Sequence, residues 1–353
     1  MGLTAQDPLA HLGGASGVLG ALVDGASLSA ADAELVMDHV FDGHADPAQV
    51  AGFLVALRAK GETAEELTGM VRSMVAHAHR VELPVEAMDI VGTGGDGHHS
   101  VNISTMAALI VAGAGVTVCK HGNRAASSMV GTADVLEGLG VKIEMTPADV
   151  VRCVVEAGIG FCFAPAFHPA MRFVGPIRKA LGIRTAFNFL GPLANPARPT
   201  RLLVGTSDSL MAERMATVLG ANGITRAWVV NSNDGFDEFS LSAPSKVVEV
   251  LGDGQGSFEL GRFTVDPTSM GFEPSGIDAV RGGDVAMNAR AITDLLAGER
   301  GPIRDMAILN AAAALVVAEE AGTIEEGLDL AARSIDEGRA AHALESLAAA
   351  SQG

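Results

Sequence analysis

The hydrophobic pattern divides the chain into a helical N-terminal part and a longer part in which short apolar runs alternate with helical segments. Residues 1 to about 82 carry apolar side chains at helical spacing, and three segments there have helix boundary signals. Ser29 is a candidate N-cap, Pro47 lies near a first turn that leads to a C-terminal Gly61, and Thr63 with Glu66 forms a capping box. We expect no strand in this region.

From about residue 87 the pattern changes to one typical of an α/β protein. Short apolar runs are separated in several places by longer helical patterns, which predicts a parallel sheet flanked by helices. The runs are AMDIV, GVTVC, GIGFCFA, RLLVGTS and RAWVVN. The stretch LGDGQGSFEL predicts a hairpin or turn, and the tail from about Ser275 is again helix-rich. The apolar runs Met106–Cys119 and Ala311–Ala318 are too short to span a bilayer and predict buried helices.

Composition and charge narrow the class of partner. The 353 residues are 48% hydrophobic, which is typical of a globular protein with one large or two ordinary domains. Acidic residues outnumber basic ones by 42 to 24, giving a net charge of −18. A field of that sign repels nucleic acid, and a small anionic substrate needs a locally cationic pocket or a metal.

The cysteines and the N-terminus indicate the compartment. Cys119, Cys153 and Cys162 form no C-x-x-C pair, which fits a reducing cytosol and argues against a disulfide framework or a zinc site. The chain opens with no basic-then-apolar secretory pattern. We therefore expect a cytoplasmic protein without a membrane partner.

The stretch DIVGTGGDGHHSVNIST, from Asp89 to Thr105, concentrates glycines and hydroxyl groups between a strand and a helix. A glycine-rich turn lets backbone N–H groups approach a phosphate, and the helix N-terminus adds partial positive charge. The pattern Gly92-x-Gly94-x-x-Gly97 also matches the dinucleotide fingerprint. That fingerprint requires an acid at the end of the next strand, where this chain has Lys120 and His121.

Other interpretations of this loop are a P-loop and a tight turn without a ligand. A P-loop requires Lys followed by Ser or Thr, and His98 and His99 occupy those positions. The second stretch, KHGNRAASS from Lys120 to Ser128, favours a phosphate site over a plain turn. It places three potential cations, two serines and a glycine after a buried strand, in a strongly acidic chain. A solvated basic loop is the alternative.

These motifs closely resemble those of the anthranilate phosphoribosyltransferase family, and the resemblance extends from about residue 15 to about residue 345. The N-terminal AGFLVALRAKGETAEELTGMV is similar as well. The ordered motifs are GTGGDG, NIST, KHGNRAASS, the stretch Phe167–Ala197, DGFDEFSL (Asp234–Leu241) and GGDVAMNARAI (Gly282–Ile292).

The resemblance implies a two-domain architecture and a reaction. It implies a small helical domain, residues 1–82 plus about 168–190, and a larger α/β domain, residues 83–167 and 191–353, with the active site in the cleft between them. It further implies a homodimer formed through the helical domain. The implied reaction transfers the phosphoribosyl group of phosphoribosyl pyrophosphate to the amine of anthranilate, requires Mg²⁺, and belongs to tryptophan biosynthesis.

The resemblance also assigns site residues. Contacts to phosphoribosyl pyrophosphate are implied for Gly92, Gly95, Asp96, Ser100, Asn102, Ile103, Ser104, Thr105, Lys120, His121, Gly122, Asn123, Arg124, Ala125, Ala126, Ser127, Ser128 and Thr132. Contacts to anthranilate are implied for Gly92, Asn123, His168 and Arg178, with Arg178 holding the carboxylate. Metal ligation is implied for Ser104, Asp237 and Glu238. The motifs depart from the usual family pattern at His98, His99 and Met287.

The implied chemistry needs no obligatory acid or base. An aromatic amine is already neutral at pH 7, so it needs positioning more than deprotonation, and rate comes from orientation and electrostatic preorganisation. Three rival functions stay open: a pyrimidine nucleoside phosphorylase, which shares the architecture; a non-catalytic relative that binds nucleic acid; and a Rossmann dehydrogenase, which lacks the required acid after the second strand. Thymidine phosphorolysis separates the first from the family reaction, and a salt-dependent DNA shift tests the second.

Overall fold

The computed structural model describes residues 8–125 and 129–353, which form two compact units. The first unit combines the chain up to His79 with His168–Ala194, and the second combines Arg80–Phe167 with Asn195–Gly353. The sequence predicts these boundaries at about residues 82 and 190. No helix in the described part of the chain combines the length and apolar character that crossing a bilayer requires.

The first unit is helical, and its boundary signals act as predicted. The Ser29 side chain accepts a hydrogen bond from the Asp32 N–H, and Thr63 and Glu66 form the reciprocal capping box. In residues 8–79 the described backbone contains no strand. The helices of this unit are η1 (Ala10–Leu12), α1 (Gly14–Val23), α2 (Ala30–Phe41), α3 (Pro47–Lys60), α4 (Ala64–Ala76), η2 (Pro169–Phe173), α9 (Gly175–Leu181), α10 (Phe187–Leu190) and η3 (Gly191–Leu193).

The second unit is built on a seven-stranded sheet with the order β3-β2-β1-β4-β5-β6-β7. Its first five strands are parallel, and the β6–β7 hairpin adds two antiparallel strands at one edge. The predicted mainly parallel sheet and the predicted hairpin are therefore confirmed. The strands are β1 (Met88–Gly92), β2 (Val118–Gly122), β3 (Ile159–Phe163), β4 (Arg201–Gly205), β5 (Arg226–Ser232), β6 (Ser245–Gly252) and β7 (Phe258–Val265).

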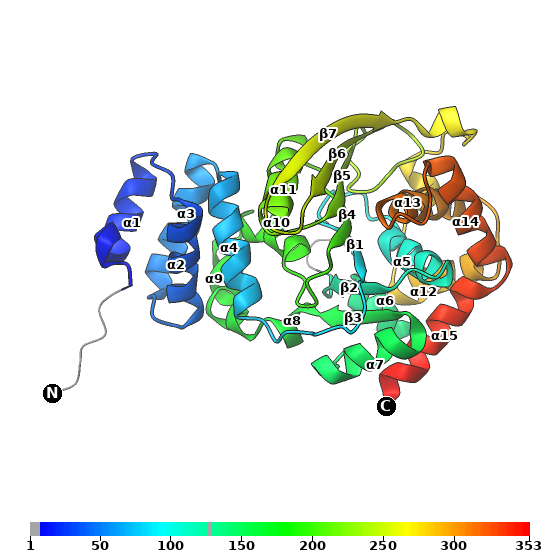
Figure 1. Cartoon of the computed structure of the whole chain (residues 1–353), viewed down its shortest axis with the longest axis horizontal. Helices are drawn as coiled ribbons and strands as arrows, with labels where there is room; N and C mark the ends of the chain where they lie inside the picture. The colour runs from blue at the N-terminus through cyan, green and yellow to red at the C-terminus, as the bar shows by residue number, and fades with distance from the viewer. Residues whose placement is uncertain (1–7, 126–128) are drawn as a thin grey trace. The chain divides into compact units, whose positions relative to one another are not determined.

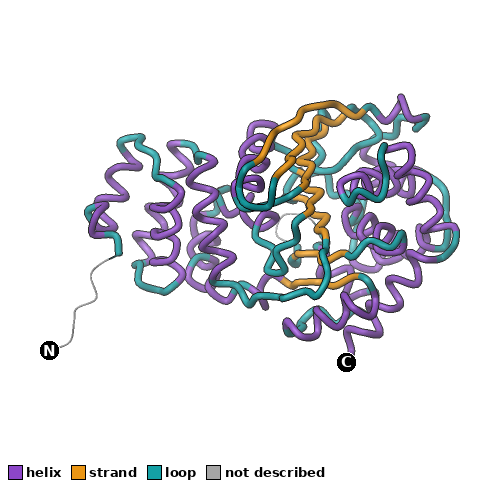
Figure 2. Tube along the Cα trace, in the orientation of Figure 1, coloured by secondary structure: helices purple, strands orange, loops and turns teal. Residues whose placement is uncertain are grey.

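Helices cover both faces of this sheet (Figures 1 and 2). Helix α11 packs on β5, β6 and β7, and α5 and α13 pack on the opposite face of the central strands. The helices of this unit are α5 (Ile103–Gly113), α6 (Thr132–Gly138), α7 (Pro147–Ala157), α8 (Ala164–Phe167), α11 (Ser209–Ala221), η4 (Pro267–Met270), η5 (Ile277–Val280), α12 (Val285–Leu296), α13 (Pro302–Val317), α14 (Ile324–Asp336) and α15 (Arg339–Gln352).

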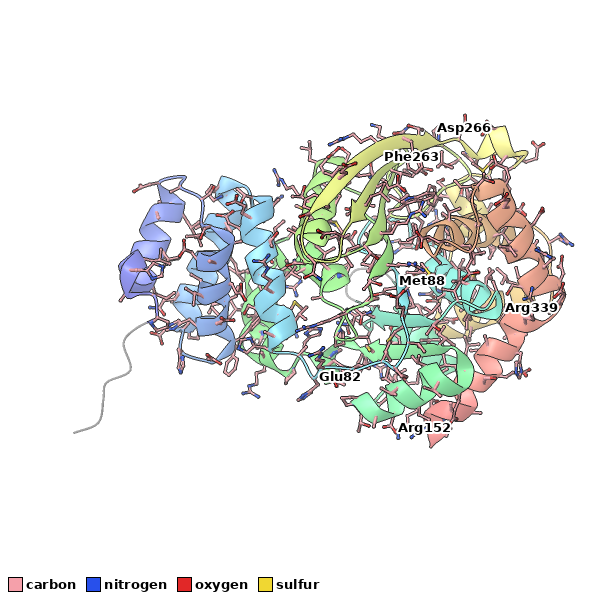
Figure 3. The ribbon with its side chains drawn as sticks, in the orientation of Figure 1. Glu82, Met88, Arg152, Phe263, Asp266 and Arg339 are labelled. Atoms are coloured by element: carbon pink, nitrogen blue, oxygen red, sulfur yellow. The ribbon has the colours of Figure 1, made fainter. Side chains whose placement is uncertain are left out.

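The core of this unit is mostly aliphatic, because the chain has few aromatic residues. Trp228 on β5 meets Phe263 on β7 edge to face, with ring centroids 5.0 Å apart. Phe263 is labelled in Figure 3. The run Ala311–Ala318 lies mainly in the buried helix α13, as predicted. The prediction of a buried helix over the whole run Met106–Cys119 is wrong, because the helix ends at Gly113 and the run finishes in strand β2. An apolar run does not distinguish buried helix from buried strand.

Candidate functional site

Three connections lie at the carboxyl edge of the parallel strands. Residues 93–102 follow β1, residues 123–125 and 129–131 follow β2, and residues 233–238 follow β5. Strands β1 and β4 are neighbours in the sheet. Strands β2 and β3 lie on the far side of β1, and β5 lies on the far side of β4, so the direction in which successive strands are added reverses between β1 and β4. Ligands of open α/β sheets bind at such a reversal, outside the carboxyl ends of the strands. This edge is the candidate site.

The glycine-rich connection after β1 is shaped by backbone conformation and by a close approach. Gly94, Gly95 and Gly97 have φ angles of 66°, 73° and 79°, in the left-handed region that other residues rarely adopt. Gly92 is required for space, because a Cβ there would lie 2.5 Å from Asp237 Oδ2. The Gly94 N–H donates to the same oxygen at 2.6 Å. The glycine loop is therefore held against the turn that follows β5.

That turn places the carboxyl groups of Asp237 and Glu238 beside Asp96 of the glycine loop. Burial, followed by the charge of Asp96, raises the pKa of Asp237 to about 7. Burial, followed by the charge of Asp237, raises the pKa of Glu238 well above its ordinary value. Carboxylates held this close repel one another when ionised, and a divalent cation relieves the repulsion.

The donor set fits Mg²⁺. Mg²⁺ prefers hard oxygen ligands and is usually held through one or two carboxylates, with water and substrate phosphates completing its shell. Among the described residues, no three His, Cys, Asp or Glu side chains are arranged to hold a metal by themselves. The two carboxylates therefore fit a Mg²⁺ site in which the phosphates of the substrate complete the coordination shell.

Ser104, at the start of α5, joins the acidic pair. Its backbone N–H donates to the Glu238 carboxylate, and its Oγ accepts from Lys120 Nζ at 3.2 Å. Lys120 also donates to the Ile90 carbonyl. Burial lowers the pKa of Lys120, while the charges of Asp89 and Glu238 act against that shift. The three predicted metal-site residues, Ser104, Asp237 and Glu238, thus lie in one neighbourhood.

The predicted cationic loop needs a correction at its first two residues. Lys120 and His121 belong to β2 and are buried, with 2% and 3% exposure. The strand continues in register with β3, where His121 pairs with Cys162. Lys120 is therefore an interior charge that supports Ser104 and Glu238, rather than a cation of a surface loop.

Arg124 is the cation that the second connection exposes. Its Nη1 lies 2.9 Å from both Asp134 Oδ1 and Glu137 Oε2 of α6, which raises the pKa of the guanidinium. The N–H groups of Ala125 and Gly131 both donate to Asp134 Oδ2 at 2.9 Å and close the loop. Exposed ion pairs contribute little to stability, so a phosphate can compete for this guanidinium.

The other predicted phosphate contacts differ in accessibility. Asn123 is exposed, and its Oδ1 accepts from the Arg124 N–H at 2.7 Å. Ile103 and Thr105 are each 1% exposed, and their backbone N–H groups donate to the Val101 carbonyl at 2.7 Å and to the Asn102 carbonyl at 3.0 Å. Ala126, Ser127 and Ser128 lie outside the described residues. The remaining predicted contacts, Gly122, Ser100 and Thr132, are half-buried.

His168 and Arg178 belong to the helical unit. Arg178 is half-buried on α9, with its guanidinium 5.5 Å from the centroid of the Phe187 ring. Burial lowers the pKa of Arg178, and within the described residues no carboxylate pairs with it. An arginine that is partly desolvated and lacks an internal acid is suited to a carboxylate from a ligand.

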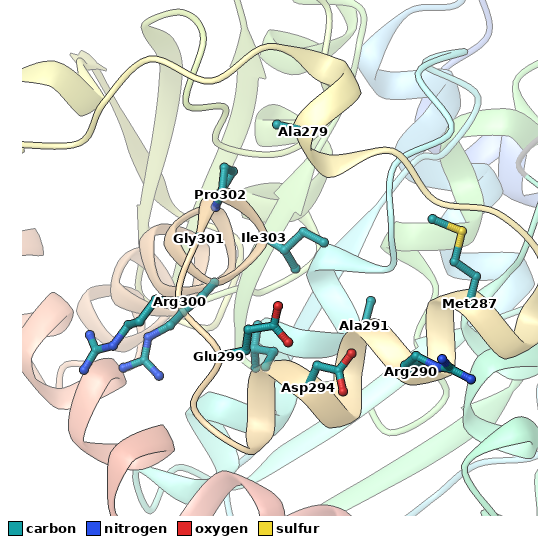
Figure 4. Close-up of a pocket in the computed structure, with 12 residues that line it drawn as sticks. Ala279, Met287, Arg290, Ala291, Asp294, Glu299, Arg300, Gly301, Pro302 and Ile303 are labelled. Carbon is teal, nitrogen blue, oxygen red and sulfur yellow. The ribbon is translucent and has the colours of Figure 1, made fainter.

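A hollow of about 390 Å³ lies elsewhere in the α/β unit, beside α12 and the start of α13 (Figure 4). Asp294, Glu299, Arg290 and Arg300 line it with both signs of charge. Its described lining includes none of the residues predicted for the phosphate or metal sites. The hollow is therefore not the candidate site.

Known proteins match this chain over nearly its whole length. A model of the glycosyl transferase family helical bundle domain matches residues 16–78, and a model of the glycosyl transferase family a/b domain matches residues 85–341. The anthranilate phosphoribosyltransferase of Salinispora arenicola is 52% identical over 336 residues, covering 93% of this chain and 94% of that protein. The Thermomicrobium roseum protein of the same name is 50% identical, covering 94% and 95%.

This chain belongs to the anthranilate phosphoribosyltransferase family. Solved structures of the family have the same fold. The Thermus thermophilus enzyme superposes with a TM-score of 0.88 at 39% identity, covering 95% of this chain and 99% of that one. The Saccharomyces cerevisiae enzyme, in complex with phosphoribosyl pyrophosphate and Mg, gives 0.86 at 26% identity, with 96% and 98% covered. Family membership excludes the dehydrogenase that the glycine spacing alone permits.

Sequence reasoning missed three residues that shape this family site. These residues are Asp89, Asn195 and Phe236. Asp89 is buried on β1, and its carboxylate accepts from the His121 N–H at 3.2 Å and from Asn195 Nδ2 at 2.9 Å. Burial raises the pKa of Asp89 to about 6, opposed mainly by Lys120. An acid inside the apolar run AMDIV is a sequence signal for such a buried counter-charge. Phe236, the third, carries the stacked ring of His98.

His168 makes a testable contribution to the stability of the helical unit. Burial lowers its pKa to about 4, although hydrogen bonds to the backbone of Met74 and Ala194 act in the opposite direction. A histidine whose folded pKa lies below its unfolded value of about 6.5 stabilises the fold fully above that pH. This contribution is lost as the pH falls through 6.5 towards 4.

We therefore expect the wild-type protein to lose about 3 kcal/mol of unfolding free energy from this group across that window. Urea unfolding at several pH values measures it. His168→Gln removes the titrating group and should flatten the profile, and His342→Gln, on the exposed part of α15, is the matched control. An unchanged profile in His168→Gln would contradict the assignment.

Proposed function

We propose that this chain transfers the phosphoribosyl group of phosphoribosyl pyrophosphate to the amine of anthranilate and releases pyrophosphate, as a step of tryptophan biosynthesis. The supporting observation is the convergence of the glycine loop, the start of α5 and the acidic turn at one sheet edge, with Gly94 bonded to Asp237 and Ser104 to Glu238. Family membership supports the same reaction.

We assign the diphosphate to the glycine loop and the positive N-terminal end of α5. Helix α5 begins at Ile103 without a side-chain cap, and its first N–H groups donate to the Val101 carbonyl, the Glu238 carboxylate and the Asn102 carbonyl. The helix therefore contributes its partial positive charge to the binding of an anion. The Arg124 guanidinium of the second connection supplies a further donor. Asp237, Glu238 and the Ser104 hydroxyl would hold Mg²⁺, which supplies positive charge against the departing diphosphate.

In the reaction, the anthranilate nitrogen forms a bond to ribose C1 while the bond from C1 to pyrophosphate breaks. The amine then loses one proton to solvent, so no side chain has to act as an obligatory base. Arg178 holds the anthranilate carboxylate with two parallel hydrogen bonds. Holding both reactants in place turns a bimolecular reaction into an effectively unimolecular one.

The decisive experiment measures the loss of anthranilate fluorescence with purified protein, phosphoribosyl pyrophosphate and Mg²⁺. Controls omit phosphoribosyl pyrophosphate or add a chelator, and a parallel assay follows thymidine phosphorolysis. The proposal predicts turnover only in the complete mixture. Thymidine cleavage without anthranilate consumption would favour the nucleoside phosphorylase instead.

His98 provides a prediction about the glycine loop. Its ring stacks on buried Phe236, with centroids 4.3 Å apart and planes 20° apart, and so ties the glycine loop to the acidic turn. A stacked aromatic pair contributes about 0.5–1.5 kcal/mol. His98→Ala is therefore expected to raise the KM for phosphoribosyl pyrophosphate by about 2- to 12-fold.

His98→Phe keeps the stack and is expected to retain the wild-type KM in steady-state kinetics. Its failure to do so would show that the ring nitrogens matter rather than the stacking. An unchanged KM in His98→Ala would show that the stack does not contribute to binding phosphoribosyl pyrophosphate.

We further propose a cytoplasmic homodimer formed through the helical unit. Val23 of α1 and Val55 of α3 are 76% and 41% exposed on that unit, and the three cysteines are buried free thiols. Light scattering coupled to gel filtration tests the dimer, and Val55→Glu should shift the protein towards monomer.

A further inference from the structure

Asn288 is a buried amide on α12 that makes none of the proposed substrate contacts. Its side chain is almost fully enclosed, with 2% exposure, and it lies on the helix that follows the segment Val280–Gly283. A buried amide is retained only where its donors and acceptor are satisfied. Its partners show what it holds.

The hydrogen bonds of Asn288 form a relay to both phosphate loops. Its Oδ1 accepts from the Gly283 N–H at 2.8 Å, and its Nδ2 donates to Asn102 Oδ1 at 2.9 Å. Asn102 in turn donates from Nδ2 to the Val130 carbonyl at 3.1 Å. Asn102 ends the glycine-loop connection, and Val130 lies near the end of the second connection.

The direction of this relay is fixed at both ends by backbone groups. The Gly283 N–H can only donate, so the oxygen of Asn288 must face it and the NH₂ group must face Asn102. The Val130 carbonyl can only accept, so Asn102 must present its NH₂ group there and its oxygen to Asn288. Each amide therefore has one orientation that satisfies its neighbours, and the relay specifies one arrangement of the two loops.

Backbone hydrogen bonds also join the segment before α12 to the glycine-loop connection. The Gly282 N–H donates to the His99 carbonyl at 2.8 Å, and the Val101 N–H donates to the Val280 carbonyl at 3.0 Å. A Cβ on Gly282 would lie 2.9 Å from both Asn288 Oδ1 and the Ser100 carbonyl oxygen. This segment thus runs beside residues 99–101 at a distance that only glycine allows.

We infer that Asn288 is a positioning residue for phosphoribosyl pyrophosphate, acting through Asn102 to hold the two phosphate loops in one relative arrangement. The inference rests on the proposed function, because it takes both loops as diphosphate contacts. Without the relay, the loops keep their own secondary structure but must be ordered when the substrate binds. The cost falls on the substrate that the loops contact, so its KM rises while the KM for anthranilate does not.

Asn288→Asp tests the relay with almost no change in volume. The carboxylate still accepts from the Gly283 N–H, but it turns an oxygen towards Asn102 Oδ1 in place of a donor. We expect at least a tenfold higher KM for phosphoribosyl pyrophosphate, with the KM for anthranilate within twofold of wild type. Ser334→Ala is the matched control, because Ser334 is equally buried and donates one hydrogen bond, to the Ile110 carbonyl, away from both loops.

A double-mutant cycle with Asn102→Ala separates positioning from general packing. If Asn288 acts through Asn102, Asn288→Asp should add less than a twofold change in the Asn102→Ala background. Equal effects in both backgrounds, or a folded Asn288→Asp protein with normal KM values, would overturn the inference. Should Asn288→Asp fail to fold, Asn288→Ser removes the amide without adding charge, and the same KM criteria apply. Absence of any anthranilate turnover by wild type would instead refute the proposed function.

Discussion

Replacing Asp237 by Asn and Glu238 by Gln together is expected to lower kcat/KM by about 10³-fold, because a metal that neutralises a leaving group supplies several kcal/mol. Both replacements preserve side-chain volume, and the Asn oxygen can still accept from the Gly94 N–H that Asp237 binds at 2.6 Å. The change therefore removes the negative charge and leaves the local fold. Initial rates at saturating Mg²⁺ measure the loss.

The same variant should be more stable than wild type in the absence of metal at pH 8. Burial and Asp96 raise the pKa of Asp237 to about 7, above its ordinary value. A carboxyl group with a raised folded pKa stabilises the fold below its unfolded pKa, and this contribution is lost as pH rises through the folded pKa. Wild type thus loses stability between about pH 4 and pH 7, and the neutral variant does not.

Thermal unfolding with a chelator measures this difference. Asp305→Asn is the matched control for activity: burial also raises the pKa of Asp305, so the same rule predicts a stability gain, but the residue lies outside the three connections. Lower activity together with lower stability in the double variant would mean that the pair is structural rather than metal-binding.

Arg178→Lys is expected to raise the KM for anthranilate by about 10- to 100-fold, because hydrogen bonds to charged groups contribute about 1.5–3 kcal/mol. Lysine keeps the charge but cannot make two parallel bonds to a carboxylate. The KM for phosphoribosyl pyrophosphate should stay within about twofold, since Arg178 is assigned no part in binding the diphosphate.

Arg172→Lys is the matched control for this prediction. Arg172 lies in the same unit and also stacks on an aromatic ring, with its guanidinium 4.6 Å from the centroid of Phe173. It is exposed, and we expect its replacement to leave both KM values near wild type. Equal losses for the two substrates in Arg178→Lys would refute a role specific to the carboxylate.

The sequence alone determined most of the fold, because its signals are local. Capping at Ser29, Thr63 and Glu66 depends on residues three positions apart. The alternation of apolar runs with helical patterns is equally local and predicts the parallel sheet. The motifs on the loops also stand in the sequence as continuous stretches, so the candidate site and its family resemblance could be predicted together.

Tertiary structure decided which way the polar residues of those motifs face and what they contact. Lys120 appears in sequence as a loop cation, but the register of β2 with its neighbours places it inside, between Asp89 and Glu238. The relay through Asn288 joins residues 186 positions apart. Hydrogen bonds and charge interactions of this kind act over a few ångströms of space, and separation along the chain carries no information about them until the strands and helices have packed.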